Sequence, residues 1–179
     1  SAFIYKKTIK VGCIESVCEA FEVNKQSTYS VAWIDCLSKG KSLGRSVLML
    51  GEHAEQGGLD IDASQKISIP FVTPSALLNR LTIKAFNAAY WYKSKHNSDQ
   101  TVSLMPYFYP LDAVGEWNKL YGKKGFLQFQ CVIPKVDGVA NMRKLLSEIS
   151  NSGEGSFLAV LKQFGTGNAN LLSFPTEGY

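Results

Sequence analysis

The strongest constraint on the fold is a strand–helix–strand–strand pattern near each end of the chain. In the first passage, β-branched and aromatic residues over 3–11 predict a strand, and apolar residues at helical spacing over 13–23 predict a helix. Two further strands are predicted over 28–36 and 46–50. Consecutive strands with one intervening helix are typical of α+β domains.

The second passage has the same order of elements. Residues 126–133 predict a strand, 138–151 a helix, and 156–164 and 171–174 two more strands. No periodic sequence identity links the passages, so we interpret them as a similar order of secondary-structure elements rather than as a sequence repeat. Together the two β-α-β-β passages predict the α+β class, with an antiparallel or mixed β-sheet and helices on one face.

A helical insertion separates the two passages. A helix is predicted from Ser75 to about Tyr92, then a polar loop over 96–100, an extended segment over 102–109 and a short helix over 111–121. We expect the first of these helices to bury a stripe of small and apolar residues: Leu78, Leu81, Ala85, Ala88 and Ala89.

Composition limits the function classes. The chain has 179 residues, 45% of them hydrophobic and 19% charged, as in an ordinary globular domain. No run approaches the ~18 apolar residues of a membrane-spanning helix. The formal net charge is +4 and the lysines are scattered, so we expect no nucleic-acid partner.

Metal and common nucleotide motifs are missing from the sequence. The closest cysteine pair, Cys13 and Cys18, lacks CxxC spacing, and neither of the 2 histidines has a metal-type neighbour. GxGxxG, Walker and nucleophile-elbow patterns are missing too. We therefore expect no metal site and a cytoplasmic setting with reduced cysteines. Apolar neighbours predict that Cys18, Cys36 and Cys131 are buried.

Lys162 interrupts an apolar stripe. In a strand over 156–164, alternation places Lys162 on one face with Leu158, Val160 and Phe164. An ammonium group buried without a partner is costly, so the side chain either snorkels to water or faces a pocket that holds an anion or polar ligand. The strand alone leaves both alternatives open.

Two further positions admit two interpretations. In a strand over 126–133, Cys131 shares an apolar face with Leu127 and Phe129, which suits a small core residue. Trp33 lies in a predicted strand, where it is either a core aromatic residue or one wall of a ligand pocket.

Several motifs, in order and spacing, resemble one enzyme family. The chain is similar to the FAD-linked oxidases of the vanillyl-alcohol oxidase type and, within them, to the decaprenylphosphoryl-β-D-ribose 2-oxidases. The resemblance covers about 29–50 and 80–175. It rests on YSVAWID at 29–35, LGRS at 43–46, YPLDAVGEWN at 109–118, GFLQFQ at 125–130, SFLAVLKQFG at 156–165 and LSFP at 172–175.

The resemblance implies a domain of a larger flavoenzyme. Residues 1–179 would form the substrate-binding (cap) domain, and FAD would be held mainly by an N-terminal domain absent from this sequence. The whole enzyme would oxidise a sugar hydroxyl, with a polyprenyl-phosphoryl pentose as the expected substrate. Its partners would be the FAD domain of the same chain, the lipid-linked sugar, and a separate reductase.

The resemblance also assigns roles to residues. Lys162 matches the active-site lysine near the flavin and the sugar, so it is the expected catalytic and cofactor-binding residue. Cys131 matches a pocket cysteine and Trp33 a pocket-wall tryptophan. Phe129 and Gln130 complete the expected substrate-binding set. Phe129 and Pro106 stand where polar residues are common in the family, and these departures concern the choice of substrate.

Two other function classes compete with this hypothesis. The first is a non-catalytic α+β ligand-binding or interaction module in which Lys162 merely snorkels. The second, less favoured by the scattered charge, is nucleic-acid binding. For the full-length protein, the cytoplasmic expectation includes association with a membrane surface as an open alternative.

Overall fold

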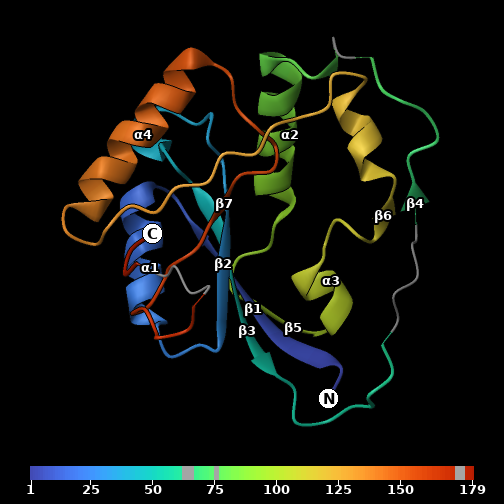
Figure 1. Ribbon diagram of the computed structural model, residues 1–179, viewed down its shortest axis with the longest axis vertical. Helices are drawn as coiled ribbons and strands as arrows, with labels where there is room; N and C mark the ends of the chain where they lie inside the picture. The colour runs from blue at the N-terminus through green and yellow to red at the C-terminus, as the bar shows by residue number, and fades with distance from the viewer. Residues whose placement is uncertain (62–66, 75–76, 172–175) are drawn as a thin grey trace.

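The computed structural model describes residues 1–61, 67–74, 77–171 and 176–179. An antiparallel sheet of five strands, in the order β5-β1-β3-β2-β7, forms its centre (Figure 1). A small parallel pair, β4 with β6, makes a second sheet. The strands span Phe3–Val11 (β1), Tyr29–Ile34 (β2), Ser46–His53 (β3), Ile67–Ser68 (β4), Ser98–Ser103 (β5), Val114–Gly115 (β6) and Val160–Leu161 (β7).

Helices lie on both sides of the main sheet. In Figure 1, α1 (Ile14–Val23) and α4 (Gly138–Ser152) lie to one side of β2, and α2 (Arg80–Lys93) lies to the other. The α+β class and the antiparallel sheet are confirmed. As expected, α1 and α4 lie on the same face of the sheet, whereas α2, the helix of the insertion, covers the opposite face. The shorter helices are α3 (Leu104–Phe108) and two 3-10 helices, η1 (Gly40–Ser42) and η3 (Trp117–Tyr121).

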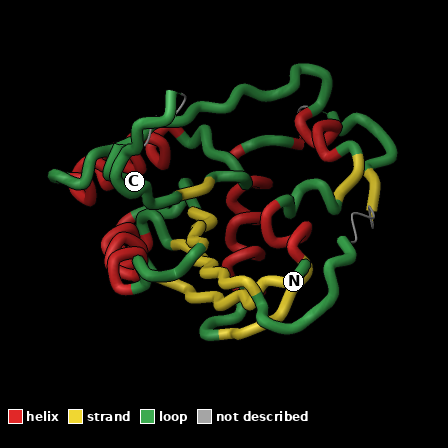
Figure 2. The backbone as a smooth tube through the Cα atoms, turned by 60° about the horizontal axis from the view of Figure 1, so that its bottom comes forward, coloured by secondary structure: helices red, strands yellow, loops and turns green. Residues whose placement is uncertain are grey.

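The main core lies between the sheet and α1. Side chains alternate along a strand, so Ala32 and its cross-strand partner Leu48 project to the same face. There they meet Val17 and Phe21 of α1, all four being fully or almost fully buried. The view in Figure 2 shows α1 packed beside the strands in the same way. This half of the fold follows the predicted first passage.

Helix α2 buries a different face from the predicted one. Its first turn is fixed by Asn79, whose Oδ1 accepts hydrogen bonds from the amides of Leu81 and Thr82. The predicted start at Ser75 lies outside the described residues. Leu81 is 78% exposed, whereas Asn87 is completely buried, so the predicted stripe is wrong. The inward face is set by a polar network, which an apolar pattern does not reveal.

The polar network joins α2 to the ends of β2 and β3. The Asp35 carboxylate accepts a hydrogen bond from Arg45 Nε at 2.9 Å and forms an ion pair with the same guanidinium. Its other oxygen accepts from Asn87 Nδ2 at 3.0 Å and from the Leu37 amide at 3.1 Å. Asp35 is buried, so these donors offset the cost of removing its charge from water.

Pairing with β1 overrides local sequence pattern in the insertion. The segment predicted as a polar loop contains the first half of β5, whose residues Ser98 and Gln100 pair with Thr8 and Lys6. Part of the predicted extended segment is instead α3, and only the end of the predicted helix over 111–121 is helical, as η3. Strand pairing with a distant segment is not visible in a polar stretch of sequence.

The second passage is less regular than predicted. Its helix is confirmed as α4, but no strand forms over 126–133, and within 156–164 only β7 pairs in the sheet. The predicted strand over 171–174 lies, except for Leu171, outside the described residues. Alternation of apolar residues indicates that one face of an extended segment could be buried. A strand also needs a neighbouring strand to which its backbone can hydrogen-bond along its length.

Candidate functional site

Trp33 anchors the face of the sheet that α2 covers. It lies opposite Val160 in the β2–β7 pairing and is 6% exposed. Its indole Nε1 donates a hydrogen bond to the carbonyl oxygen of Phe157 at 3.0 Å, and its ring lies 4.5 Å from that of Tyr90, centroid to centroid. Trp33 is thus a fixed core aromatic residue at the base of this face, with its polar group satisfied.

Lys162 follows β7 directly and projects to the same face as Trp33. On one side of it in the chain, Leu161 is buried in the α1 core. On the other side, Gln163 Nε2 donates to Glu22 of α1 at 2.6 Å. Because alternate residues of an extended chain point to opposite faces, the Lys162 side chain points away from α1. The structure therefore brings Lys162 and Trp33 to one face of the sheet.

The surroundings of Lys162 differ from the predicted apolar stripe. Val160 is 52% exposed, and Lys162 itself is exposed. Among the described residues, the Lys162 ammonium has no ion pair and no hydrogen bond. Because the Lys162 ammonium is solvated by water, its charge does not require a partner from the described residues. Lys162 is therefore an accessible cation without an ion-pair partner in the described part of the chain, available to an anionic or polar ligand.

A row of aromatic side chains extends from Trp33. Phe86 and Tyr90 lie one turn apart on α2, and Phe86 contacts Phe157 at a ring-centroid distance of 5.4 Å. Phe157 stacks on Tyr121 of η3 at 5.4 Å, and Tyr121 lies 4.3 Å from Phe126. We call this set the aromatic row: Trp33, Phe86, Tyr90, Trp117, Tyr121, Phe126 and Phe157.

The aromatic row was missed by the sequence reasoning. Part of its signal is the i, i+4 spacing of Phe86 with Tyr90, which places this pair on one side of an α-helix. The row remains partly open: Phe86 and Phe126 are 48% and 45% exposed. Partly exposed aromatic rings that touch one another form a surface suited to an apolar chain or a flat ring.

The remaining predicted residues lie on an exposed segment beyond the row. Phe129 is 82% exposed, and Gln130 and Cys131 are exposed as well. The prediction that Cys131 is a buried thiol is wrong, because no strand forms here to place it in a core. Within the described part of the chain, no hydrogen bond, ion pair or ring contact joins these three side chains to Lys162 or Trp33.

The backbone nevertheless brings the two segments close together. Pro134 and Phe164 each form a bridge with Gly178, so residues 177–179 lie between the segment that carries Cys131 and the one that carries Lys162. The amide of Ile133 donates to the Tyr179 carbonyl oxygen at 2.8 Å. A Cβ at Gly178 would overlap the Ile133 carbonyl oxygen, so only glycine permits this approach.

A polar clamp on the opposite face holds these three segments against α1. Glu22 accepts hydrogen bonds from Gln163 Nε2 and from the Tyr179 hydroxyl, and pairs with Lys135 Nζ at 2.9 Å. The hydrogen bond from Lys135 lowers the pKa of Glu22, and the same contact raises the pKa of Lys135. Burial raises the pKa of Tyr179, which keeps its hydroxyl protonated as a donor. We call Glu22, Lys135, Gln163 and Tyr179 the polar clamp.

The clamp predicts a pH-dependent stability. Because the folded protein lowers the pKa of Glu22, its contribution is present above the ordinary value of 4.5 and is lost as the pH falls through the lowered value. Urea unfolding curves recorded across this acidic range should therefore show stability falling with pH. Glu22→Gln should flatten that slope, and Glu148→Gln on α4, an exposed carboxyl, serves as the control. An identical slope in wild type and Glu22→Gln would contradict the prediction.

The other cysteines behave as inert core thiols. Cys18 and Cys36 are buried and free, as predicted. Burial raises the pKa of Cys18 to about 11 and also raises the pKa of Cys36. Both thiols therefore stay protonated near neutral pH, so neither is suited to act as a nucleophile. Within the described residues, no group of three or more metal-ligating side chains is found.

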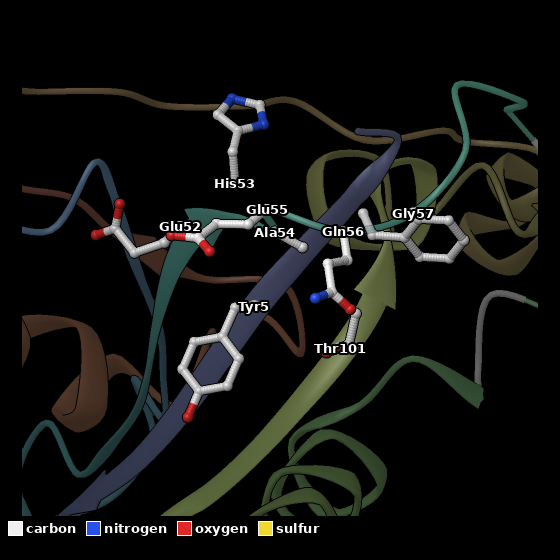
Figure 3. Close-up of a pocket in the computed structure, with 9 residues that line it drawn as sticks. Tyr5, Glu52, His53, Ala54, Glu55, Gln56, Gly57 and Thr101 are labelled. Carbon is white, nitrogen blue, oxygen red and sulfur yellow. The ribbon is translucent and has the colours of Figure 1, made fainter.

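A separate cavity lies at another part of the sheet. It has a volume of about 680 Å³ and is lined by residues of β1 and β5 and of the chain at the end of β3. Figure 3 shows that its side chains, among them Tyr5, Glu52 and His53, spread in different directions rather than converging. Glu52 is already bonded to Thr28, and His53 to Tyr29. This cavity contains none of the predicted site residues.

Comparison with known proteins supports the motif resemblance. No family model matches the chain. The chain is similar to a protein of Mycolicibacterium smegmatis named decaprenylphosphoryl-beta-D-ribose oxidase, with 37% identity over 161 residues. The match covers 85% of this chain and 35% of the relative, so the chain spans about a third of the relative's length. The resemblance inferred from the motifs is thereby confirmed. In the described part of the chain, no helix combines the length and apolarity needed to cross a membrane.

Proposed function

We propose that this chain is the substrate-binding domain of a flavin-dependent oxidoreductase that oxidises a hydroxyl of a lipid-linked sugar. The observation that carries the proposal is the Lys162 cation, which has no ion pair among the described residues and lies on the same sheet face as Trp33 and the aromatic row. The similarity to a decaprenylphosphoryl-beta-D-ribose oxidase supports it and favours a polyprenyl-phosphoryl pentose as substrate.

Lys162 is the proposed catalytic residue. FAD, when bound by a neighbouring domain of the full-length protein, supplies the hydride acceptor. The Lys162 ammonium can stabilise negative charge that develops in the transition state, and can donate a hydrogen bond to a sugar hydroxyl. The donor fits this task because it is exposed and has no carboxylate partner among the described residues. A neutralised lysine would offer much less to developing negative charge.

The apolar surface has a different role in the proposal. The partly open rings of Phe86, Tyr90 and Phe126 offer contact area to the first isoprene units of a polyprenyl chain. The exposed segment with Phe129, Gln130 and Cys131 is the proposed opposite side of the substrate channel. Apolar side chains on this segment are compatible with coverage by substrate or by another domain.

The proposal includes a cellular setting and a partner. Four free cysteines fit a reducing compartment, so we place the protein in the cytoplasm. A lipid-linked substrate would bring the full-length protein to a membrane surface. Oxidation of a sugar hydroxyl gives a ketone, and a separate reductase would complete an epimerisation.

The full-length gene product provides the test. We expect it to be yellow, to carry flavin, and to be bleached anaerobically by a polyprenyl-phosphoryl pentose. The matched control is the same polyprenyl phosphate without the sugar, which should leave the flavin oxidised. A colourless protein that binds the lipid-linked sugar would contradict the oxidoreductase and favour the non-catalytic module. Flavin that no sugar alcohol reduces would contradict the proposal equally.

A further inference from the structure

A second cavity, smaller than the first, is lined mainly by cationic side chains. It has a volume of about 230 Å³ and lies between the loop after β2 and the first turns of α2. No carboxylate lines it among the residues that the structure describes. We call it the basic cavity; its lining residues are Leu37, Ser38, Lys39, Ser42, Arg45, Arg80 and Lys84.

Most of the charge in the basic cavity is uncompensated. Arg45 is neutralised by its ion pair with Asp35 at 2.8 Å. Lys39 Nζ donates to the neutral Asn151 side chain at 2.9 Å and so keeps its full charge. Arg80 and Lys84 have no ion pair among the described residues. Three positive charges therefore share one small concavity, an arrangement that is repulsive unless an anion binds.

The frame of the basic cavity is well fixed. The Ser38 hydroxyl donates to the Asp35 carbonyl oxygen at 2.8 Å and accepts from the Gly44 amide at 3.2 Å, which closes the loop. Arg80 packs beside Gly153 at the end of α4, where an added Cβ would lie 3.0 Å from Arg80 Cδ. The cationic groups thus come from three parts of the chain held in a defined arrangement, which favours a specific site over a diffuse charged surface.

The donors belong to side chains rather than to the end of the helix. Asn79 already accepts from the amides of Leu81 and Thr82, so these groups of α2 are satisfied. A guanidinium and two ammonium groups remain, and Ser42 is also among the lining residues. This set matches a phosphate group, which carries negative charge and several acceptor oxygens.

We propose that the basic cavity binds a phosphate group. The phosphate belongs either to a small soluble ligand or to a phospholipid headgroup, which present the same chemistry to Arg80 and Lys84. The site shares no lining residue with the face that carries Trp33 and Lys162, so it does not depend on the function proposed for that face.

Two binding assays with matched variants test the proposal. In the first assay, the full chain is titrated with pyrophosphate at low salt and binding is measured by isothermal titration calorimetry. Sedimentation should be measured with vesicles of phosphatidylcholine alone and with added phosphatidylglycerol. The double variant Arg80→Gln with Lys84→Gln should weaken binding by roughly tenfold or more. The control, Lys93→Gln with Lys95→Gln, removes the same charge at the other end of α2 and should leave binding nearly unchanged.

The two arms distinguish the source of the phosphate. Pyrophosphate binding without vesicle binding supports a soluble ligand, and binding only to phosphatidylglycerol vesicles supports a headgroup. The proposal is overturned if neither probe binds. It is also overturned if both double variants weaken binding equally, because that result reports net charge rather than a site. Circular dichroism of each variant confirms that folding is retained, since Arg80 and Lys84 are exposed.

Discussion

Replacing Lys162 by methionine in the full-length protein is expected to slow reduction of the flavin by a lipid-linked sugar by about 100-fold. The physical reason is the loss of the cation that we propose stabilises negative charge developing in the transition state. The rate is measured by anaerobic stopped-flow absorbance at saturating substrate. Lys162→Arg keeps the charge and should recover part of the rate.

Two controls separate this effect from a structural one. Lys144→Met removes an exposed lysine from α4 and should leave the reduction rate unchanged. The unfolding free energy of the Lys162→Met protein should change by less than about 0.5 kcal/mol, because the side chain is exposed. An unaltered rate of flavin reduction in Lys162→Met would remove this residue from the catalytic site and favour a snorkelling lysine.

Asp35→Ala is expected to lower the free energy of unfolding by about 3 kcal/mol. The Asp35 side chain is 3% exposed and accepts from Arg45, Asn87 and a backbone amide. Its removal leaves the Arg45 guanidinium, which is 18% exposed, without its counter-charge and the Leu37 backbone amide without its acceptor. Urea unfolding followed by tryptophan fluorescence measures the loss.

An exposed ion pair gives the matched comparison. Glu15 pairs with Arg143, and the two side chains are 44% and 48% exposed. Water solvates either partner when the other is removed, so Glu15→Ala should cost no more than about 1 kcal/mol. Similar losses in Asp35→Ala and Glu15→Ala would refute the claim that the buried network stabilises the junction of α2 with the sheet.

Local pattern predicted the elements whose partners are close in sequence. β1, α1, β2 and β3 each carry a clear periodicity, and α4 shows the spacing of an amphipathic helix. The first half of β5 was missed because its residues, Ser98 to Gln100, are polar, and they form a strand only because β1 pairs with them. The exposed segment over 126–132 shows the reverse case. Its alternating apolar residues predicted a strand, but no neighbouring strand pairs with it and no strand forms.

Lys162 and Trp33 could be singled out as candidates from the sequence, whereas the aromatic row and the arrangement of the site could not. Lys162 was found from the cost of placing a charge in an apolar stripe, and the motif resemblance pointed to Trp33. Their common face depends on the register that sets Val160 opposite Trp33, which no local pattern encodes. Asn87 was missed because a buried amide is defined by its partners rather than by helical periodicity.

The pairing of β7 with β2 also has a consequence for the order of folding. It joins Ala32 to Leu161, so it closes a loop that contains most of the chain, whereas β2 and β3 are near neighbours in sequence. Loop closure over long separations is slow and entropically costly. We therefore expect a nascent chain to form the β2–β3 hairpin with α1 first. Lys162 therefore joins the sheet face that carries Trp33 only late in synthesis, after β2, β3 and α1 have formed.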